Sequence, residues 1–188
     1  MTTSSTKETI LGIARARVQA LGYNALSFRE IAKEVGIKSA SIHHHFPTKG
    51  DLGAALARRY TEDGVKYLTG LSEQSQDPRF LINGYTAIFR SALVNDNRMC
   101  LCGIMAAEYQ DLPLEVRTEV DAFTEANVNW LVTVLSLQQG DAPLKTLQQK
   151  ALAIYSAVEG AQLVSRGRND IAAFDETVDV YRAAGLLP

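Results

Sequence analysis

The chain has 188 residues, enough for one domain or two small ones, and its 46% hydrophobic and 21% charged residues are typical of an ordinary globular protein. No apolar run reaches the roughly 18 residues that suggest a membrane span, and the polar residues 1–6 lack the apolar stretch of a signal peptide. We therefore expect a cytoplasmic protein with no membrane partner.

The net charge of −2 conceals an uneven distribution of charge along the chain. Residues 1–60 contain nine Lys and Arg against four Asp and Glu, a net charge of +5, whereas the remainder contains ten against 17, a net charge of −7. A basic N-terminal part on an acidic remainder concentrates positive potential where a polyanion binds. The asymmetry favours a nucleic-acid partner without identifying one.

The N-terminal third predicts a series of short helices. Ile10, Ile13, Ala14, Val18 and Leu21 share one face of a first helix, which Gly22 ends. Further helix signals follow: the capping box Ser27–Glu30 before a helix that Gly36 ends, a second short helical stretch over 37–46, and a long helix capped by Thr48 that runs into the low seventies.

The rest of the chain also has helical spacing of its apolar residues. Asp77 and Pro78 begin the next helix as cap and first residue. A short helix around 101–110, a long helix after Pro113 and two final helices over 144–166 and 170–184 follow. The sequence therefore predicts an all-α chain of about nine helices, without internal repeats.

Two short helices joined by a tight glycine turn are typical of a helix-turn-helix that binds DNA. The second helix must pack one side and present small or hydrogen-bonding side chains to the major groove. The side chains available for bases or phosphates are Arg29, Lys38, Ser39, Ala40, Ser41, His43 and His44, with Thr48 and Lys49 at a helix N-terminus that favours phosphate.

The segments 26–37 and 42–52 resemble the DNA-binding domain of the TetR family of regulators. The resemblance implies nine helices, with a three-helix DNA-binding domain at the N-terminus (1–50) and a helical ligand-binding and dimerisation domain after it (51–188). By position it implies that Arg29, Ser39, Ser41, His43 and His44 face DNA, and that His45 and Lys49 bind phosphate.

Position 43 is usually a tyrosine in that family, and here it is a histidine. Because histidine titrates near neutral pH, we hypothesise that DNA affinity depends more on pH than with tyrosine. The run His43–His45 does not predict a metal site, since consecutive helical residues point about 100° apart.

In the second domain, the resemblance implies a ligand pocket among the middle helices and a dimer interface on the last two. Candidates for the pocket are Tyr85, Phe89, Cys100, Cys102, Met105, Tyr109, Phe123 and Trp130, each of which is also ordinary core filling. Candidates for the interface are the small-residue stripe Ala153, Ala157, Gly160, Ala161 and Val164, with packing inside the subunit as the alternative.

The sequence predicts no enzyme, no cofactor and no metal. It has no catalytic motif, and we interpret Glu108 and Glu159 as helix-surface charges. We expect a homodimeric repressor that binds a palindromic operator in double-stranded DNA. We expect it to release this operator when an unidentified small-molecule effector binds. Two alternatives stay open: regulation through Cys100 and Cys102 as sensors of electrophiles or redox state, and DNA binding without ligand control.

Overall fold

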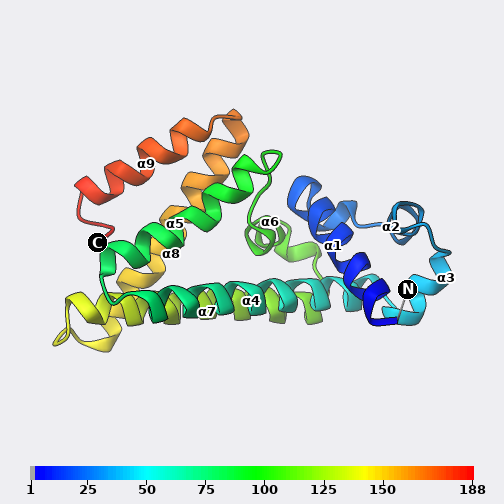
Figure 1. The fold of residues 1–188 in the computed structure, drawn as a ribbon, viewed down its shortest axis with the longest axis horizontal. Coiled ribbons are helices and arrows are strands. Elements are labelled where there is room, and N and C mark those ends of the chain that lie inside the picture. Colours follow the sequence, from blue (N-terminus) through cyan, green and yellow to red (C-terminus); the bar gives the residue numbers. More distant parts are fainter. Residues whose placement is uncertain (1–2) are drawn as a thin grey trace. The chain divides into compact units, whose positions relative to one another are not determined.

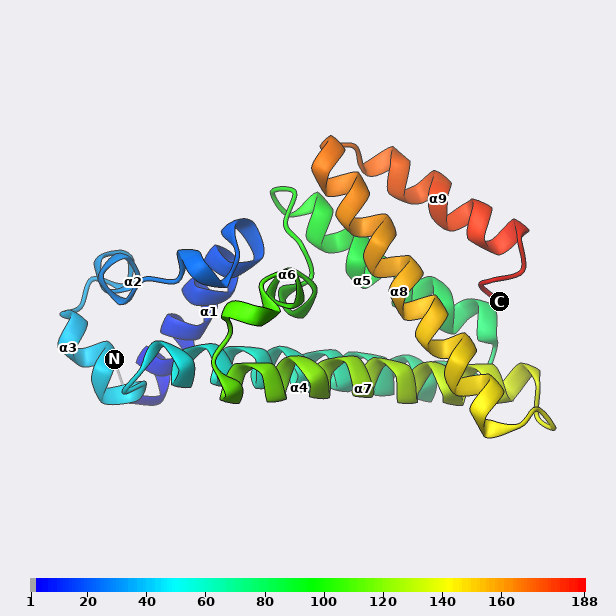
Figure 2. The same cartoon turned by 180° about the vertical axis from the view of Figure 1, so that it is seen from behind.

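The computed structural model describes residues 3–188, which form nine α-helices and two short 3-10 helices and contain no strand (Figures 1 and 2). The predicted all-α class and the number of helices are confirmed. In chain order the elements are α1 (Thr3–Leu21), η1 (Tyr23–Ala25), α2 (Phe28–Val35), α3 (Ser39–His45), α4 (Lys49–Gln74), α5 (Pro78–Val94), α6 (Leu101–Ala107), η2 (Tyr109–Asp111), α7 (Leu114–Gln138), α8 (Leu144–Arg168) and α9 (Ile171–Ala183).

Two compact units make up the chain. Within the described residues, unit 1 contains 3–60 and Leu101–Phe123, and unit 2 contains Thr61–Cys100 and Thr124–Pro188. The helices α4 and α7 each begin in unit 1 and end in unit 2. None of the helices within residues 3–188 combines the length and apolar character that crossing a membrane requires.

Unit 1 is held together by α1, against which α2 and α6 pack. Ile10, Ala14 and Val18 are buried as their helical spacing predicts, and they form one core with Ile31 of α2. Leu21 is an exception to the predicted apolar face, because its side chain is 66% exposed. It is the last residue of α1.

Unit 2 is built around α5, α8 and α9, which pack against one another. Asn169 ends α8 in the left-handed conformation (φ 52°), and the Asp170 side chain caps α9 by accepting from the Ala173 amide at 3.3 Å. This short connection makes α8 and α9 a helical hairpin (Figure 2). Phe174 of α9 and Tyr85 of α5 are the largest fully buried side chains of the unit.

Candidate nucleic-acid interface

The turn between α2 and α3 is fixed by backbone geometry. Ser27 caps α2 by accepting from the Glu30 amide at 3.5 Å, as the predicted capping box requires. Gly36 ends α2 with φ 78° and ψ 32°, a left-handed conformation that glycine adopts without steric cost. The amides of Gly36 and Ile37 both donate to the Ala32 carbonyl, at 3.0 and 2.9 Å. Three residues therefore separate the two helices, and α3 begins at Ser39 rather than at the predicted residue 37.

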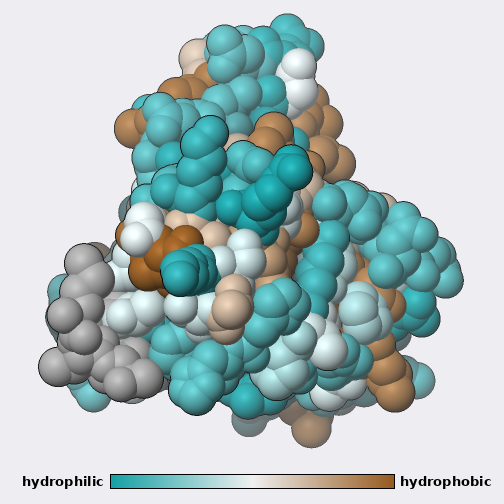
Figure 3. Space-filling view, turned by 90° about the vertical axis from the view of Figure 1, so that its right-hand side faces the viewer, coloured by the Kyte–Doolittle hydropathy of each residue, from teal (hydrophilic) through white to brown (hydrophobic). Residues whose placement is uncertain are grey.

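The helix α3 has one apolar and one polar face. Ile42 is fully buried and Phe46, directly after the helix, is 3% exposed. Its remaining side chains reach solvent: Lys38, Ala40, His43 and His44 are exposed, and Ser39, Ser41 and His45 are half-buried. Figure 3, which faces the end of the molecule that carries α2 and α3, shows a mostly hydrophilic surface. The predicted DNA-facing side chains therefore lie together on an accessible helix.

The ring of His43 is held in position by two neighbours. Its Nδ1 lies 3.2 Å from the carbonyl oxygen of Pro47, and its edge packs against the Phe28 ring with centroids 4.7 Å apart. Because a carbonyl oxygen only accepts, this contact requires hydrogen on Nδ1. In the neutral ring Nε2 is then left as an acceptor for another group.

Arg29 and Lys49, the two basic residues expected to touch DNA on either side of α3, differ in their surroundings. The Arg29 side chain is 87% exposed and its Nε lies 3.4 Å from a Glu30 carboxylate oxygen. Lys49 donates to the Asn24 carbonyl at 3.2 Å, and its Nζ lies 4.6 Å above the Tyr23 ring. Partial burial lowers the pKa of Lys49, and Glu108 opposes that change. Arg29 can extend to a ligand directly, whereas Lys49 has to exchange its contacts first.

The N-terminus of α4 is capped reciprocally. The Asp51 amide donates to the Thr48 hydroxyl at 3.0 Å, and the Thr48 amide donates to the Asp51 carboxylate at 2.9 Å. This arrangement confirms the predicted cap at Thr48. It satisfies the backbone amides of Thr48 and Asp51 at the start of α4.

Glu108 is a residue whose role the sequence did not indicate. Its Oε2 accepts from the amides of Tyr23 at 2.5 Å and Asn24 at 3.4 Å, so it joins the end of α6 to the η1 turn within unit 1. A Cβ at Gly22 (φ +88°) would lie 2.7 Å from the other carboxylate oxygen. The interpretation of Glu108 as a plain surface charge is therefore wrong, and only the tertiary contact could have identified its role.

The pocket candidates in unit 1 are mostly core residues. Cys102 and Met105 are fully buried, and Phe123 packs against Tyr60 with ring centroids 5.5 Å apart. Tyr109 instead donates from its hydroxyl to Asp121 at 2.8 Å. This hydrogen bond raises the pKa of Tyr109.

The pocket candidates in unit 2 form an aromatic cluster. The Tyr85 ring lies 5.2 Å from that of Phe89 and stacks on Trp130 at 5.6 Å with an interplanar angle of 19°. Cys100 is 2% exposed, and its amide donates to Gln162 at 2.9 Å. Glu159 lies near this cluster and its carboxylate oxygens are buried, so its interpretation as a surface charge is wrong.

The small-residue stripe on α8 is divided between surface and core. Ala153 and Val164 are exposed and Ala157 and Gly160 half-buried, whereas Ala161 is 4% exposed and packs inside unit 2. Larger apolar side chains also reach solvent on the α8–α9 hairpin, namely Leu152, Leu163 and Val180, at 49%, 53% and 63% exposure. The hairpin thus presents apolar surface made of larger residues than the sequence suggested.

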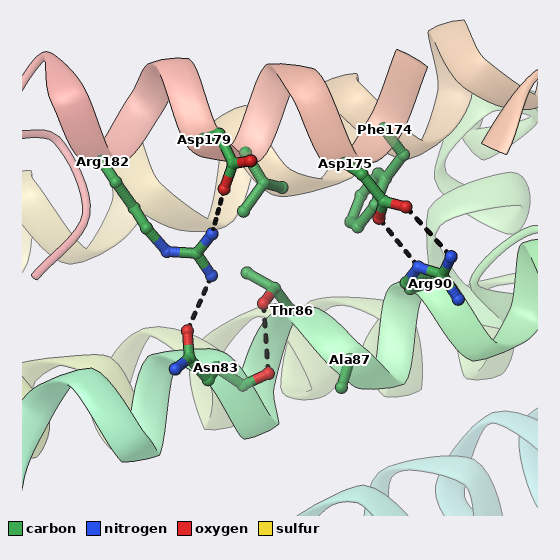
Figure 4. A pocket seen from close by; sticks show the side chains of 9 residues that line it. Asn83, Thr86, Ala87, Arg90, Phe174, Asp175, Asp179 and Arg182 are labelled. Carbon is green, nitrogen blue, oxygen red and sulfur yellow. Dashed lines mark hydrogen bonds and ion pairs between the residues drawn. The ribbon is translucent and has the colours of Figure 1, made fainter. Parts of the chain in front are cut away.

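A groove of about 280 Å³ lies between α5 and α9 in unit 2 (Figure 4). Arg90 pairs with Asp175 at 2.8 Å, and Arg182 pairs with Asp179 at 2.7 Å. The Arg90–Asp175 pair joins α5 to α9, whereas the Arg182–Asp179 pair lies within α9. Arg182 reaches α5 by donating to the Asn83 side-chain oxygen at 2.7 Å. Within residues 3–188, no group of three or more His, Cys, Asp or Glu side chains is arranged to hold a metal ion.

An all-α chain with a rigid turn and an exposed polar helix near its N-terminus has the architecture of a helix-turn-helix DNA-binding regulator. Residues 10–56 match the family described as bacterial regulatory proteins, tetR family. A TetR transcriptional regulator from Legionella pneumophila is 33% identical, with 95% of this chain and 96% of that chain covered and a TM-score of 0.86. The chain belongs to the TetR family of transcriptional regulators.

Other solved structures have the same fold. A TetR-family regulator from Agrobacterium tumefaciens is 31% identical over 94% of this chain and 95% of that chain, with a TM-score of 0.86. The reduced form of NemR from E. coli is 18% identical over 97% of each chain, with a TM-score of 0.80, and is similar in fold alone. No curated protein matches the chain in sequence.

Proposed function

We propose that this protein is a cytoplasmic, dimeric, ligand-responsive repressor. It binds a palindromic operator through α2 and α3 and releases it when a small molecule binds the helical domain 51–188. The observation that carries the proposal is the polar face of α3, which reaches solvent while Ile42 and Phe46 anchor the opposite face. Such a helix is presented rigidly to the major groove.

The proposed DNA contacts divide by chemistry. Ser39 and Ser41 permit close approach of α3 to base edges, while Arg29, Lys38, His43 and His44 supply hydrogen bonds to bases or phosphates. His45 and Lys49 bind phosphate. For Lys49 this requires the ammonium to leave the Tyr23 ring and the Asn24 carbonyl, both of which lie beside α4 within unit 1.

The proposed dimer forms through α8 and α9. A stable interface needs an apolar centre, and Leu163, Val164 and Val180 are each more than half exposed on these helices. Sedimentation of the purified protein tests this. Val164→Asp and Val180→Asp should shift the protein to monomer, whereas Val94→Asp, an equally exposed valine on α5, should leave the dimer intact.

Release of DNA requires that effector and operator binding be coupled. A coupling free energy of about 1–3 kcal/mol changes operator affinity roughly 5- to 150-fold, which is enough for regulation. Among the pocket candidates, the effector contacts proposed are Tyr85, Phe89, Cys100 and Trp130, which all belong to unit 2. The α4 helix, which begins beside the DNA-binding residues and ends in unit 2, transmits the change.

Regulation through cysteine is the less favoured mechanism. Cys100 and Cys102 are 2% and 0% exposed, and a reactive thiol needs access to its electrophile. Labelling with N-ethylmaleimide distinguishes regulation through cysteine from regulation by a bound small molecule. A sensor reacts in the native state within minutes, whereas buried thiols react only after unfolding.

Selection of bound fragments from sheared genomic DNA tests the proposed function. The expected result is one or a few enriched fragments that carry an inverted repeat with half-sites about one helical turn apart. Screening small molecules for release of that fragment then tests ligand control. DNA binding that no compound changes would favour a regulator without ligand control.

A further inference from the structure

The interior of unit 2 contains a buried carboxyl group and a buried hydroxyl group that lie close together. Both carboxylate oxygens of Glu159, on α8, are buried, and the polar side chains beside them are those of Cys100 and Tyr155, which carry no charge to compensate that of a carboxylate. The hydroxyl of Tyr85, on α5, is buried without a hydrogen-bond partner, and the Tyr85 side chain is fully buried. Buried polar groups are normally satisfied, so two such groups near each other need an explanation.

The surroundings of Glu159 offer little compensation for a negative charge. Burial raises the pKa of Glu159 to about 7, and Cys100 and Tyr155 offset only part of this rise. No Lys or Arg side chain contributes to that pKa. Tyr85 lies close enough for the Glu159 charge to raise its own pKa further above the ordinary value. Among the residues that the structure describes, no Lys or Arg therefore compensates the charge of an ionised Glu159.

Flat aromatic surface lies beside these groups. The Trp130 indole stacks on the Tyr85 ring, and its Nε1 donates to the Ser72 hydroxyl at 3.0 Å and the Leu68 carbonyl at 3.2 Å. These bonds fix the indole in place. Aromatic faces attract both cations and apolar groups.

We propose that Glu159 recognises the positive charge of the effector, a protonated amine carried on an apolar or aromatic body. The ammonium donates to the Glu159 carboxylate and the Tyr85 hydroxyl oxygen, while the apolar body packs against the Tyr85–Trp130 pair. A buried carboxylate gains most from such a partner because its charge is otherwise uncompensated. The inference rests on the proposed function, since it names the class of its effector.

Binding of three probes of similar shape tests the proposal: 2-phenylethylammonium, 2-phenylethanol and 3-phenylpropionate. Trp130 is the single tryptophan of the chain, so its fluorescence reports directly on the site. At pH 8, the wild type should bind the ammonium at least about tenfold more tightly than the alcohol, and the carboxylate least. Glu159→Gln should abolish this preference, and Glu176→Gln, which alters an exposed carboxylate on α9, should preserve it.

Equal affinity for the ammonium and the alcohol, or a preference that survives in Glu159→Gln, would overturn the proposal. Tyr85→Phe provides a second variant, because it removes the hydroxyl and keeps the ring, and it should weaken binding of the ammonium more than of the alcohol. Operator binding measured with the same probes separates the two proposals. If the ammonium binds at Glu159 without altering DNA affinity, ligand control is contradicted and the assignment of Glu159 stands. If only neutral compounds release DNA, the assignment of Glu159 is contradicted and ligand control stands.

Discussion

Glu108 accepts a hydrogen bond from the backbone amide of Tyr23, which joins the residue after α6 to the turn after α1. The two residues are 85 positions apart in the chain. Through this bond the segment around η2 holds the start of the helix-turn-helix region. The bond also brings the Glu108 charge close to Lys49, whose pKa it raises against the effect of burial.

Glu108→Ala should lower the free energy of unfolding by about 1–2 kcal/mol, because the Tyr23 amide loses its acceptor in a partly buried place. Urea denaturation measures the change. Glu62→Ala, the same substitution at an exposed position of α4, should change stability by less than about 0.5 kcal/mol. Equal effects of both substitutions would contradict a structural role for Glu108.

Thr48→Ala should destabilise the protein by about 1 kcal/mol, because it removes the hydroxyl that accepts from the Asp51 amide. Thr48→Ser keeps the hydroxyl and should restore most of the loss. Thermal denaturation of the two variants side by side tests the cap. A serine variant as unstable as the alanine variant would mean that the hydroxyl does not carry the effect.

Glu159→Gln should stabilise the protein at alkaline but not at acidic pH. Because the folded-state pKa is raised from 4.5 to about 7, the folded protein retains a proton that the unfolded chain releases, and stability declines as pH rises through this window. The variant should therefore be more stable by on the order of 3 kcal/mol at pH 8 and equal to wild type near pH 4.5. The groups that face this carboxyl are Tyr85 from α5, Tyr155 from α8 and Cys100 before α6.

Urea denaturation at pH 5 and pH 8 measures this difference. Glu176→Gln, on the surface of α9, is the control and should give the same stability relative to wild type at both pH values. A Glu159→Gln protein that is less stable than wild type at pH 8 would show that the carboxylate has a stabilising partner.

His43→Tyr should make DNA affinity depend less on pH between 6 and 8 than it does in the wild type, because a histidine side chain can accept a proton and so attract phosphate, whereas a tyrosine side chain cannot. Fluorescence anisotropy with the selected operator measures both. Parallel pH profiles would exclude His43 as the source.

Local signals were sufficient to predict the helices. Ser27, Gly36 and Asp77 act on backbone groups within a few residues of themselves, and each caps or ends a helix as expected. Glu108 and Glu159 were misinterpreted because their environments come from residues far away in the chain. The spacing of small residues on α8 also predicted that Ala161 and Val164 share one stripe. Packing within unit 2 buries Ala161, whereas Val164 is exposed.

Operator affinity over a range of salt concentrations, compared between Arg29→Ala and Arg168→Ala, tests whether α2 and α3 bind DNA. Both arginines are exposed, but Arg168 ends α8. We expect salt-sensitive, sequence-selective binding that Arg29→Ala weakens at least about tenfold, while Arg168→Ala binds as wild type. Equal affinities of the two variants, or wild-type binding no tighter than to random DNA, would contradict this expectation.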